Sequence, residues 1–337
     1  MKTCAFGALA AFAAVALAVG CGSSGSSSGT TTAAASSKPL IVLVTDVNQL
    51  NDHGFNQLAY QGLLKAQKAL GIHGAVYQSA SAQAYIPNLS TAARKHADLV
   101  ISVGFDQADA IAKVAKQFPD TKFAIIDVNA AGLKGKPKNV RGIVFAEQEA
   151  GCLAGVAAAT TSKSGTISSV GGLKIPPVDA YIAGYQYCAK KVKPGIKTLN
   201  GYSQDFVAQD KCKELALKHF DAGSSVEFQV AGGCGLGVLD AAKEQGKWGI
   251  GVDVDQKSTA PKNVLASAGK KVDVGVYDTI QDLVQAKFRG GRDHVFALKD
   301  GGVGLLSISS KVSASIKAAN AKTAAAILSG KLKPPVK

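Results

Sequence analysis

Polar and aromatic residues gather at the ends of the predicted strands of this sequence. The first apolar run, Leu40–Val44, is followed by the heptapeptide NDHGFNQ, Asn51–Gln57, which holds three amides, a carboxylate and a phenyl ring. Rings stack on the faces of a flat ligand, while amides and carboxylates satisfy its polar edge. Residues of these types, and a group of glycines, stand within and after the strands; the full set is Asp46, Asn51, Asp52, Phe55, Phe105, Asp106, Asp109, Asp127, Asn129, Asp205, Phe206, Gly232, Gly233, Gly235, Gly237, Asp253 and Asp255. This combination is typical of a site for a flat, polar, uncharged ligand.

No catalytic motif accompanies these residues. The segment GGCGLG, Gly232–Gly237, fails the GxGxxG spacing of dinucleotide sites, because Val238 or Asp240 stands where the third glycine is needed. The sequence has no GxxxxGK[ST] phosphate loop, no HExxH motif and no GxSxG elbow, and its five histidines form no cluster. Taken singly, each strand-end residue also has a structural explanation as a helix cap, a turn residue or core. We therefore predict a binding protein that is not an enzyme and that uses no metal or cofactor.

Short Val- and Ile-rich runs alternate with amphipathic segments from residue 38 onward. The predicted strands are 40–45, 99–103, 123–128, 142–145, 165–170, 197–202, 226–230, 249–254 and 264–268. The predicted helices are 57–70, 109–118, 147–161, 179–191, 211–220, 236–245, 272–288 and 311–328. This alternation predicts an α/β protein with parallel sheets covered by helices, and its length favours two sheets. Ligands of such sheets bind outside the carboxyl ends of the strands, where the polar and aromatic residues stand.

Composition excludes some classes of partner. The 337 residues are 47% hydrophobic, which is enough for two domains with their own cores. The formal net charge is +14, but the Lys and Arg residues are scattered and form no basic block. We therefore expect a generally cationic surface and no nucleic-acid partner.

The N-terminal segment has the pattern of an export signal. Residues 1–20 combine a positive charge with an apolar stretch, and the tetrapeptide AVGC that ends at Cys21 resembles a bacterial lipobox, in which this thiol is diacylated. Residues 21–38 are almost wholly Gly, Ser, Thr and Ala, which make a flexible tether and cannot build a core. We expect a protein that is lipid-anchored to the cell membrane on its extracytoplasmic side.

Four cysteines remain after the signal and Cys21 are set aside. In an oxidising compartment this even number predicts one or two disulfides, with three pairings open. Their spacing includes no CxxC knuckle, so we do not expect a zinc site. The four are Cys152, Cys188, Cys212 and Cys234.

A series of longer motifs runs through the chain in a fixed order. They are VTDVNQLNDHGFNQLAYQGL (44–63), FPDTKFAIID (118–127), EAGCLAGVAAA (149–159), AGYQYCAK (183–190), AGGCGLGVLDAAKE (231–244), IGVDVDQ (250–256) and SAGKKVD (267–273). Together they resemble the basic membrane protein family of substrate-binding lipoproteins, the nucleoside-binding components of ABC importers. The resemblance covers nearly the whole chain after the tether.

The resemblance implies a type I periplasmic-binding-protein fold. In this fold two doubly wound α/β lobes are joined by a hinge of three crossovers and close on a ligand in the cleft between them. We place residues 39–145 and about 254–285 in the N-terminal lobe. Residues 146–253 and about 286–310 form the predicted C-terminal lobe, and 311–337 form a C-terminal helix and tail.

The resemblance also implies a purine nucleoside ligand. The base would lie between the rings of Phe55 and Phe206, and Asp46 would support the first loop. The expected polar contacts are Asn51, Asp52 and Asp127 to the base and its surroundings, and Asp253 and Lys270 to the ribose. Phe105 and Gly233, at the ends of their strands, complete the set of candidate ligand-binding residues.

Two positions depart from the family pattern. The acid that usually follows the second ring by two residues is missing, since Asp205, Phe206, Val207 and Ala208 stand in that segment. Cys152 replaces a usual aromatic residue, which favours a disulfide there over ligand contact. We expect a monomer that delivers its ligand to an ABC permease. The alternatives are a ligand-sensing surface lipoprotein of the same fold and a receptor for sugars, which aromatic and carboxylate side chains also suit.

Overall fold

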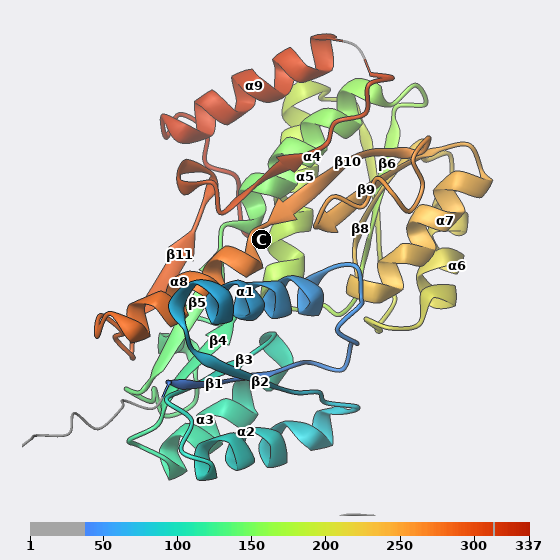
Figure 1. Ribbon diagram of the computed structural model, residues 1–337. Coiled ribbons are helices and arrows are strands. Elements are labelled where there is room, and N and C mark those ends of the chain that lie inside the picture. Colours follow the sequence, from blue (N-terminus) through green and yellow to red (C-terminus); the bar gives the residue numbers. More distant parts are fainter. Residues whose placement is uncertain (1–37, 313) are drawn as a thin grey trace, which may run out of the picture. The chain divides into compact units, whose positions relative to one another are not determined.

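The computed structural model describes residues 38–312 and 314–337. The predicted signal peptide, the lipidation residue Cys21 and nearly all of the tether lie outside the described residues. Within the described ranges, no helix has both the length and the apolar character needed to cross a bilayer. This part of the chain forms two mostly parallel sheets with helices between the strands, as predicted (Figure 1).

The first sheet contains the N-terminal strands. Its order is β11-β5-β4-β3-β1-β2, and every pair in it is parallel. Its inner strands are mostly buried and apolar, as expected for parallel strands covered on both faces. The strands are β1 (Leu40–Val44), β2 (His73–Tyr77), β3 (Leu99–Ser102), β4 (Lys122–Ile126), β5 (Val140–Phe145) and β11 (Asp293–Phe296). The helices that accompany them are α1 (Phe55–Leu70), α2 (Tyr85–Arg94), α3 (Ala108–Gln117) and α8 (Val272–Val284), with the short helices η1 (Ala82–Ala84), η2 (Phe105–Gln107) and η3 (Ala130–Gly132).

The second sheet repeats this arrangement. Its order is β12-β10-β9-β8-β6-β7, and only β12 runs antiparallel, along β10. The strands are β6 (Thr166–Gly171), β7 (Lys197–Tyr202), β8 (Val226–Val230), β9 (Trp248–Asp253), β10 (Val264–Lys270) and β12 (Val303–Leu306). The helices of this part are α4 (Glu147–Thr161), α5 (Pro176–Val192), α6 (Gln209–Asp221), α7 (Leu236–Glu244) and α9 (Ala314–Leu328), with the short helices η4 (Gly232–Gly235) and η5 (Leu298–Asp300).

The chain passes between the two sheets after β5, after β10 and after β11. Helix α8 packs on α1 beside the first sheet, and β11 then pairs with β5 before the chain returns (Figure 1). These strand pairings differ from the predicted lobe boundaries: β10 belongs to the second sheet with β9, and β11 belongs to the first. The alternation of strands and helices carries no information on which sheet a strand joins. We propose lobe boundaries at Ala146, Lys271 and Ala297.

The sequence prediction missed several edge elements. Strands β2 and β11 lie at the edges of the first sheet and β12 at an edge of the second. Their segments are short and only partly buried. Helix α2 was missed too, and its sequence contains Pro87 in the first turn, where proline is tolerated.

Two disulfides tie helices of the second lobe. Cys152 in α4 is bonded to Cys188 in α5, and Cys212 in α6 is bonded to Cys234 in η4. The sequence predicted one or two disulfides and left three pairings open; the structure has two, in one of these pairings. All four side chains are buried.

Helices α4 and α5 approach each other through glycines. A Cβ atom built on Gly155 would overlap the carbonyl oxygen of Tyr185 in the facing helix. We expect Gly155→Ala to lower the free energy of unfolding by about 1–3 kcal/mol, because the two backbones must separate. Gly195→Ala is the control, since nothing lies within 4 Å of a Cβ there. Urea unfolding of both variants tests this, and equal stabilities would contradict it.

Candidate functional site

A cavity lies between the carboxyl ends of the strands of the two sheets. The empty space in it, its open mouth included, is about 590 Å³. Both sheets contribute to its wall. The lining residues are Asp46, Asn48, Phe55, Gly104, Phe105, Asp106, Asp127, Ile175, Pro177, Val178, Tyr181, Phe206, Val230, Gly232, Val252, Asp253 and Lys270.

Most of the predicted site residues meet in this cavity. Those that line it are Asp46, Phe55, Phe105, Asp127, Phe206, Asp253 and Lys270. Asn51, Asp52 and Gly233 lie outside the lining. Asn51 is exposed to solvent, and Gly233 lies next to Gly232, which does line the cavity. Contact between any of these residues and a ligand stays a prediction.

Asp52 organises the start of helix α1. Its carboxylate accepts hydrogen bonds from the backbone amides of Gly54 and Asn56 at 2.9 Å and of Gln57 at 3.1 Å. The amides of Asn56 and Gln57 lie in the first turn of the helix, where no backbone acceptor is available to them, and Gly54 is the residue just before it. Asp52 therefore positions the neighbouring Phe55 without lining the cavity itself.

The loop from β1 to α1 is held by the buried side chain of Asn56. Its Nδ2 donates to Asp46 Oδ1 at 2.6 Å and to the carbonyl oxygen of Asn48 at 2.9 Å. The same Asp46 oxygen accepts the backbone amide of Asn48. Burial raises the pKa of Asp46 to about 6, although these hydrogen bonds oppose the rise. Asp46 thus supports the loop, as predicted from the resemblance, and also lines the cavity.

His53 of this loop links the two lobes through its backbone. Its carbonyl oxygen accepts a hydrogen bond from Gln256 Nε2 at 3.1 Å. Gln256 is almost fully buried, and its Oε1 accepts Gln229 Nε2 at 2.7 Å and the Val252 amide at 3.1 Å. Because Gln256 belongs to the second lobe, this contact joins the loop that carries Phe55 to that lobe.

Lys270 is the central charge of the site. It is the last residue of β10 and only 3% exposed. Its Nζ lies 2.7 Å from Asp127 Oδ2, 3.6 Å from Glu147 Oε1 and 4.7 Å from the centroid of the Phe55 ring. Burial alone would lower the pKa of Lys270, but the carboxylates of Asp127, Glu147 and Asp253 together raise it. Lys270 therefore stays charged at neutral pH.

Asp127 and Asp253 stand at the ends of β4 and β9. Both have a left-handed backbone, with φ of 68° and 62°, which is uncommon for residues other than glycine and is often found at functional sites. Asp127 Oδ1 is buried and has no hydrogen-bond partner among the described residues, so it is open to a donor from a ligand. Lys270 donates a hydrogen bond to Asp127. The family resemblance had assigned Asp127 to the base and its surroundings and Lys270 to the ribose.

Asp253 in the cavity and Glu147 beside it have raised pKa values. Burial raises the pKa of Asp253 to about 7 and that of Glu147 to about 8, and the charge of Lys270 opposes the rise in both. The ordinary values are 3.8 and 4.5, so the folded protein retains protons that the unfolded chain releases. Under this condition stability falls as pH rises through the interval between the unfolded and folded pKa values.

We therefore expect the thermal midpoint of unfolding to decrease as the pH is raised from about 5 to about 8. Glu147→Gln keeps the size of the side chain but removes the titrating group. Its midpoint should fall less steeply over the same interval, as followed by circular dichroism. The same slope in both proteins would contradict this expectation.

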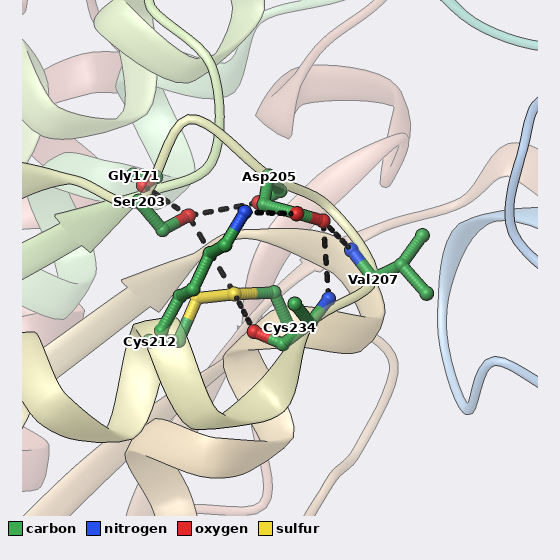
Figure 2. A network of polar contacts seen from close by, with 8 residues as sticks. Gly171, Ser203, Asp205, Val207, Cys212 and Cys234 are labelled. Carbon is green, nitrogen blue, oxygen red and sulfur yellow. Dashed lines mark hydrogen bonds and ion pairs between the residues drawn. A yellow bond between two sulfur atoms is a disulfide. The ribbon is translucent and has the colours of Figure 1, made fainter.

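Phe206 reaches the cavity from the loop between β7 and α6. Its ring lies against Gly172, where a Cβ atom would overlap the ring. The neighbouring Asp205 turns away from the cavity: its Oδ1 accepts the backbone amides of Val207 and Ala208 at 2.8 and 3.0 Å (Figure 2). A hydrogen bond from Lys211, together with these amides, lowers the pKa of Asp205 to about 2. Asp205 therefore shapes the loop.

Sequence reasoning missed much of the apolar wall. Ile175, Pro177, Val178 and Tyr181 come from the start of α5 and look like core residues in the sequence. Asn48 could have been found, because it stands between Asp46 and the NDHGFNQ segment. In the described ranges, no group of His, Cys, Asp and Glu side chains could hold a metal ion.

Two doubly wound lobes with three crossovers and a cavity between their strand ends define a type I solute-binding protein. A solved ABC-transporter solute-binding protein from Aeropyrum pernix superposes with a TM-score of 0.79 at 26% identity, covering 88% of this chain and 94% of that one. The chain also matches, over residues 40–333, the family described as Bmp, ABC transporter substrate-binding protein PnrA-like. It belongs to this family of substrate-binding proteins.

Relatives match over most of their length. The chain is 35% identical to the CD4+ T-cell-stimulating antigen of Listeria monocytogenes, over 94% of each chain. It is 35% identical to the ABC transporter nucleoside-binding protein BmpA of Lactococcus lactis, over 97% of each chain. It is 33% identical to an uncharacterized lipoprotein of Pyrococcus horikoshii, over 86% of this chain and 73% of that one.

Proposed function

We propose that this protein captures a purine nucleoside between its two lobes and delivers it to the permease of an ABC importer. The observation that carries the proposal is the placement of Phe55 and Phe206 in one cavity, each from a different lobe. Stacking on aromatic rings contributes about 1–3 kcal/mol per base, whatever the base. The relative from Lactococcus lactis, whose name states nucleoside binding, supports the ligand class.

The polar groups suit the rest of a nucleoside. Asp253 and Lys270 offer an acceptor and a donor for ribose hydroxyls, and the unpartnered Asp127 oxygen offers an acceptor to a donor on the base or the ribose. A ligand that contacts both lobes binds the closed arrangement more tightly than an open one. Closure is then the signal that a permease can recognise.

The proposal includes attachment to the membrane. Cys21 would carry the lipid and the tether would hold a monomeric receptor at the extracytoplasmic surface. Names of relatives that include the word lipoprotein support this location. Metabolic labelling with a radioactive fatty acid should mark the wild type and leave Cys21→Ala unlabelled.

Calorimetric titration of the soluble form that begins after Cys21 tests the ligand class. The ligands are adenosine, guanosine, inosine, a pyrimidine nucleoside and several sugars. We expect saturable heat with at least one purine nucleoside and none with the sugars. The absence of heat with every purine nucleoside would refute the proposal, and heat with sugars alone would assign a sugar receptor.

Asp253→Ala tests the contact with ribose. We expect affinity for the nucleoside to fall about tenfold or more and affinity for the free base to fall much less, because a charged hydrogen bond is lost only with the nucleoside. Since φ at Asp253 is positive and disfavours Ala, Asp253→Asn is measured beside it. The control is Asp255→Ala at an exposed position two residues on. Equal losses for base and nucleoside would refute the assignment.

A further inference from the structure

The disulfide between Cys212 and Cys234 lies directly behind one wall of the proposed ligand site. Cys212 is in the first turn of α6, and Cys234 is in η4, the short helix that follows β8. Gly232, at the start of η4, lines the cavity, and so does Phe206 in the loop before α6. The bond therefore joins the two segments that supply Phe206 and Gly232.

A hydrogen bond closes this connection into a ring. The backbone amide of Cys234 donates to the carbonyl oxygen of Phe206 at 2.9 Å. From Phe206 the chain runs through α6 to Cys212, across the disulfide to Cys234, and back through this hydrogen bond. Figure 2 shows the bonded cysteines beside the loop of Ser203, Asp205 and Val207. Movement of the Phe206 backbone away from η4 must therefore break this hydrogen bond, while the disulfide keeps the start of α6 next to η4.

The Phe206 ring packs against Gly172 and the core, but the loop that carries it has few backbone hydrogen bonds to the rest of the lobe. Gln204 has a left-handed backbone, with φ of 57°, and Val207 is 52% exposed. Asp205 orders the turn from within, through contacts to Val207, Ala208 and Lys211, all of which belong to the same loop and helix. The backbone bonds from Ser203 and Gln204 to Gly171 and Gly172 hold only the start of the loop. Its later part is held to the lobe by the bond from Cys234.

We propose that the Cys212–Cys234 disulfide is a positioning element of the ligand site, which sets affinity by holding the Phe206 ring in position beside η4. The role in nucleoside affinity rests on the proposed function; the restraint on the loop does not. The bond touches no ligand and acts through Phe206. Ordering a loop before binding improves affinity because less conformational entropy is lost when the ligand arrives.

The second disulfide is a matched control. Cys152 and Cys188 are as deeply buried, and their bond closes a segment of comparable length, 36 residues against 22. It joins α4 to α5 within an apolar cluster that includes Leu153, Val156 and Ile327. None of these residues lines the cavity. Removal of either bond should therefore lower the thermal midpoint, but only the bond behind Phe206 should change the site.

Affinity is measured by titration of adenosine, guanosine and inosine into C212A/C234A, C152A/C188A and wild type. We expect the first variant to bind about tenfold more weakly and the second within about twofold of wild type. The first pair is then removed in a Phe206→Ala background. In this background, removal of the disulfide should weaken nucleoside binding by less than about twofold, because a bond that acts through Phe206 has no further effect once the ring is gone.

Hydrogen exchange of the ligand-free proteins tests the restraint independently of any nucleoside. Amides of residues 203–208 should exchange faster in C212A/C234A and at the wild-type rate in C152A/C188A. If C212A/C234A does not fold, the measurements use C212V/C234A instead, in which valine fills more of the volume left by the cysteine. Equal affinity losses in both pair variants, full additivity with Phe206→Ala, or unchanged loop exchange would overturn the proposal. A wild type that binds no nucleoside refutes the proposed function, and the exchange measurement still decides the restraint.

Discussion

Lys270→Met is expected to lower the free energy of unfolding by about 3–5 kcal/mol near pH 8, because it removes one partner of a buried charge cluster. Lys270 is almost fully buried between the carboxylates of Asp127 and Glu147. Without the ammonium group these carboxylates remain buried without a countercharge. Urea unfolding of the variant and of wild type measures the loss.

The dependence of this loss on pH follows from the same groups. The pKa values of Glu147 and Asp253 are already raised to about 8 and about 7 by burial, and removal of Lys270 raises them further. At about pH 5 both groups are neutral in the folded protein, so the variant should recover part of its stability. The control is Lys213→Met, which removes contacts to Asp240 and Glu244 at the protein surface and should change stability little. An equal cost for both variants, or a cost that does not change with pH, would contradict the central place of Lys270.

Phe55→Ala is expected to weaken purine nucleoside binding by roughly 10- to 100-fold, which corresponds to the stacking of one base on one ring. Phe55 begins α1, and Asp52 holds this end of the helix by accepting backbone amides on both sides of Phe55. Its ring also lies under the Lys270 ammonium, so its loss removes a cation–π contact within the site. Calorimetry with the purine nucleosides measures the change.

Phe118→Ala is the matched control for this experiment. Phe118 follows α3, is also partly buried, and packs against the core of the first lobe away from the cavity. Both substitutions remove a phenyl ring, so both should lower the stability of the protein, but only Phe55→Ala should lower its affinity for nucleosides. If the free base and the nucleoside lose affinity equally in Phe55→Ala, the ring contacts the base, whereas an unchanged affinity would remove Phe55 from the site.

The order of strands and helices could be read from the sequence because buried parallel strands form continuous apolar runs. β1 and β3 illustrate this, since every residue in them is apolar or fully covered. Edge strands such as β11, with the sequence DHVF, escape detection because three of its four residues are exposed. The sheet that a strand joins is also not encoded locally, and for this reason β10 was placed in the wrong lobe.

The site was predictable in part for a related reason. Strand ends of parallel sheets converge at one edge, so residues such as Asp46, Asp127 and Phe206 were expected together and all line the cavity. Helix capping competes for the same residue types at the same positions. Asp52 and Asp205 satisfy backbone amides there, and no pattern in the sequence separates this use from ligand contact.

The sequence by itself determined the fold class, the family, the convergence of aromatic and carboxylate residues and the presence of paired cysteines, because these depend on local periodicity and motif order. Only the tertiary structure decided that Cys212 pairs with Cys234, that Lys270 neutralises Asp127, and that helix α5 lends Tyr181 to the wall. Each of these joins residues far apart in the chain. Such distances are set by the packing of whole lobes, which no local pattern contains.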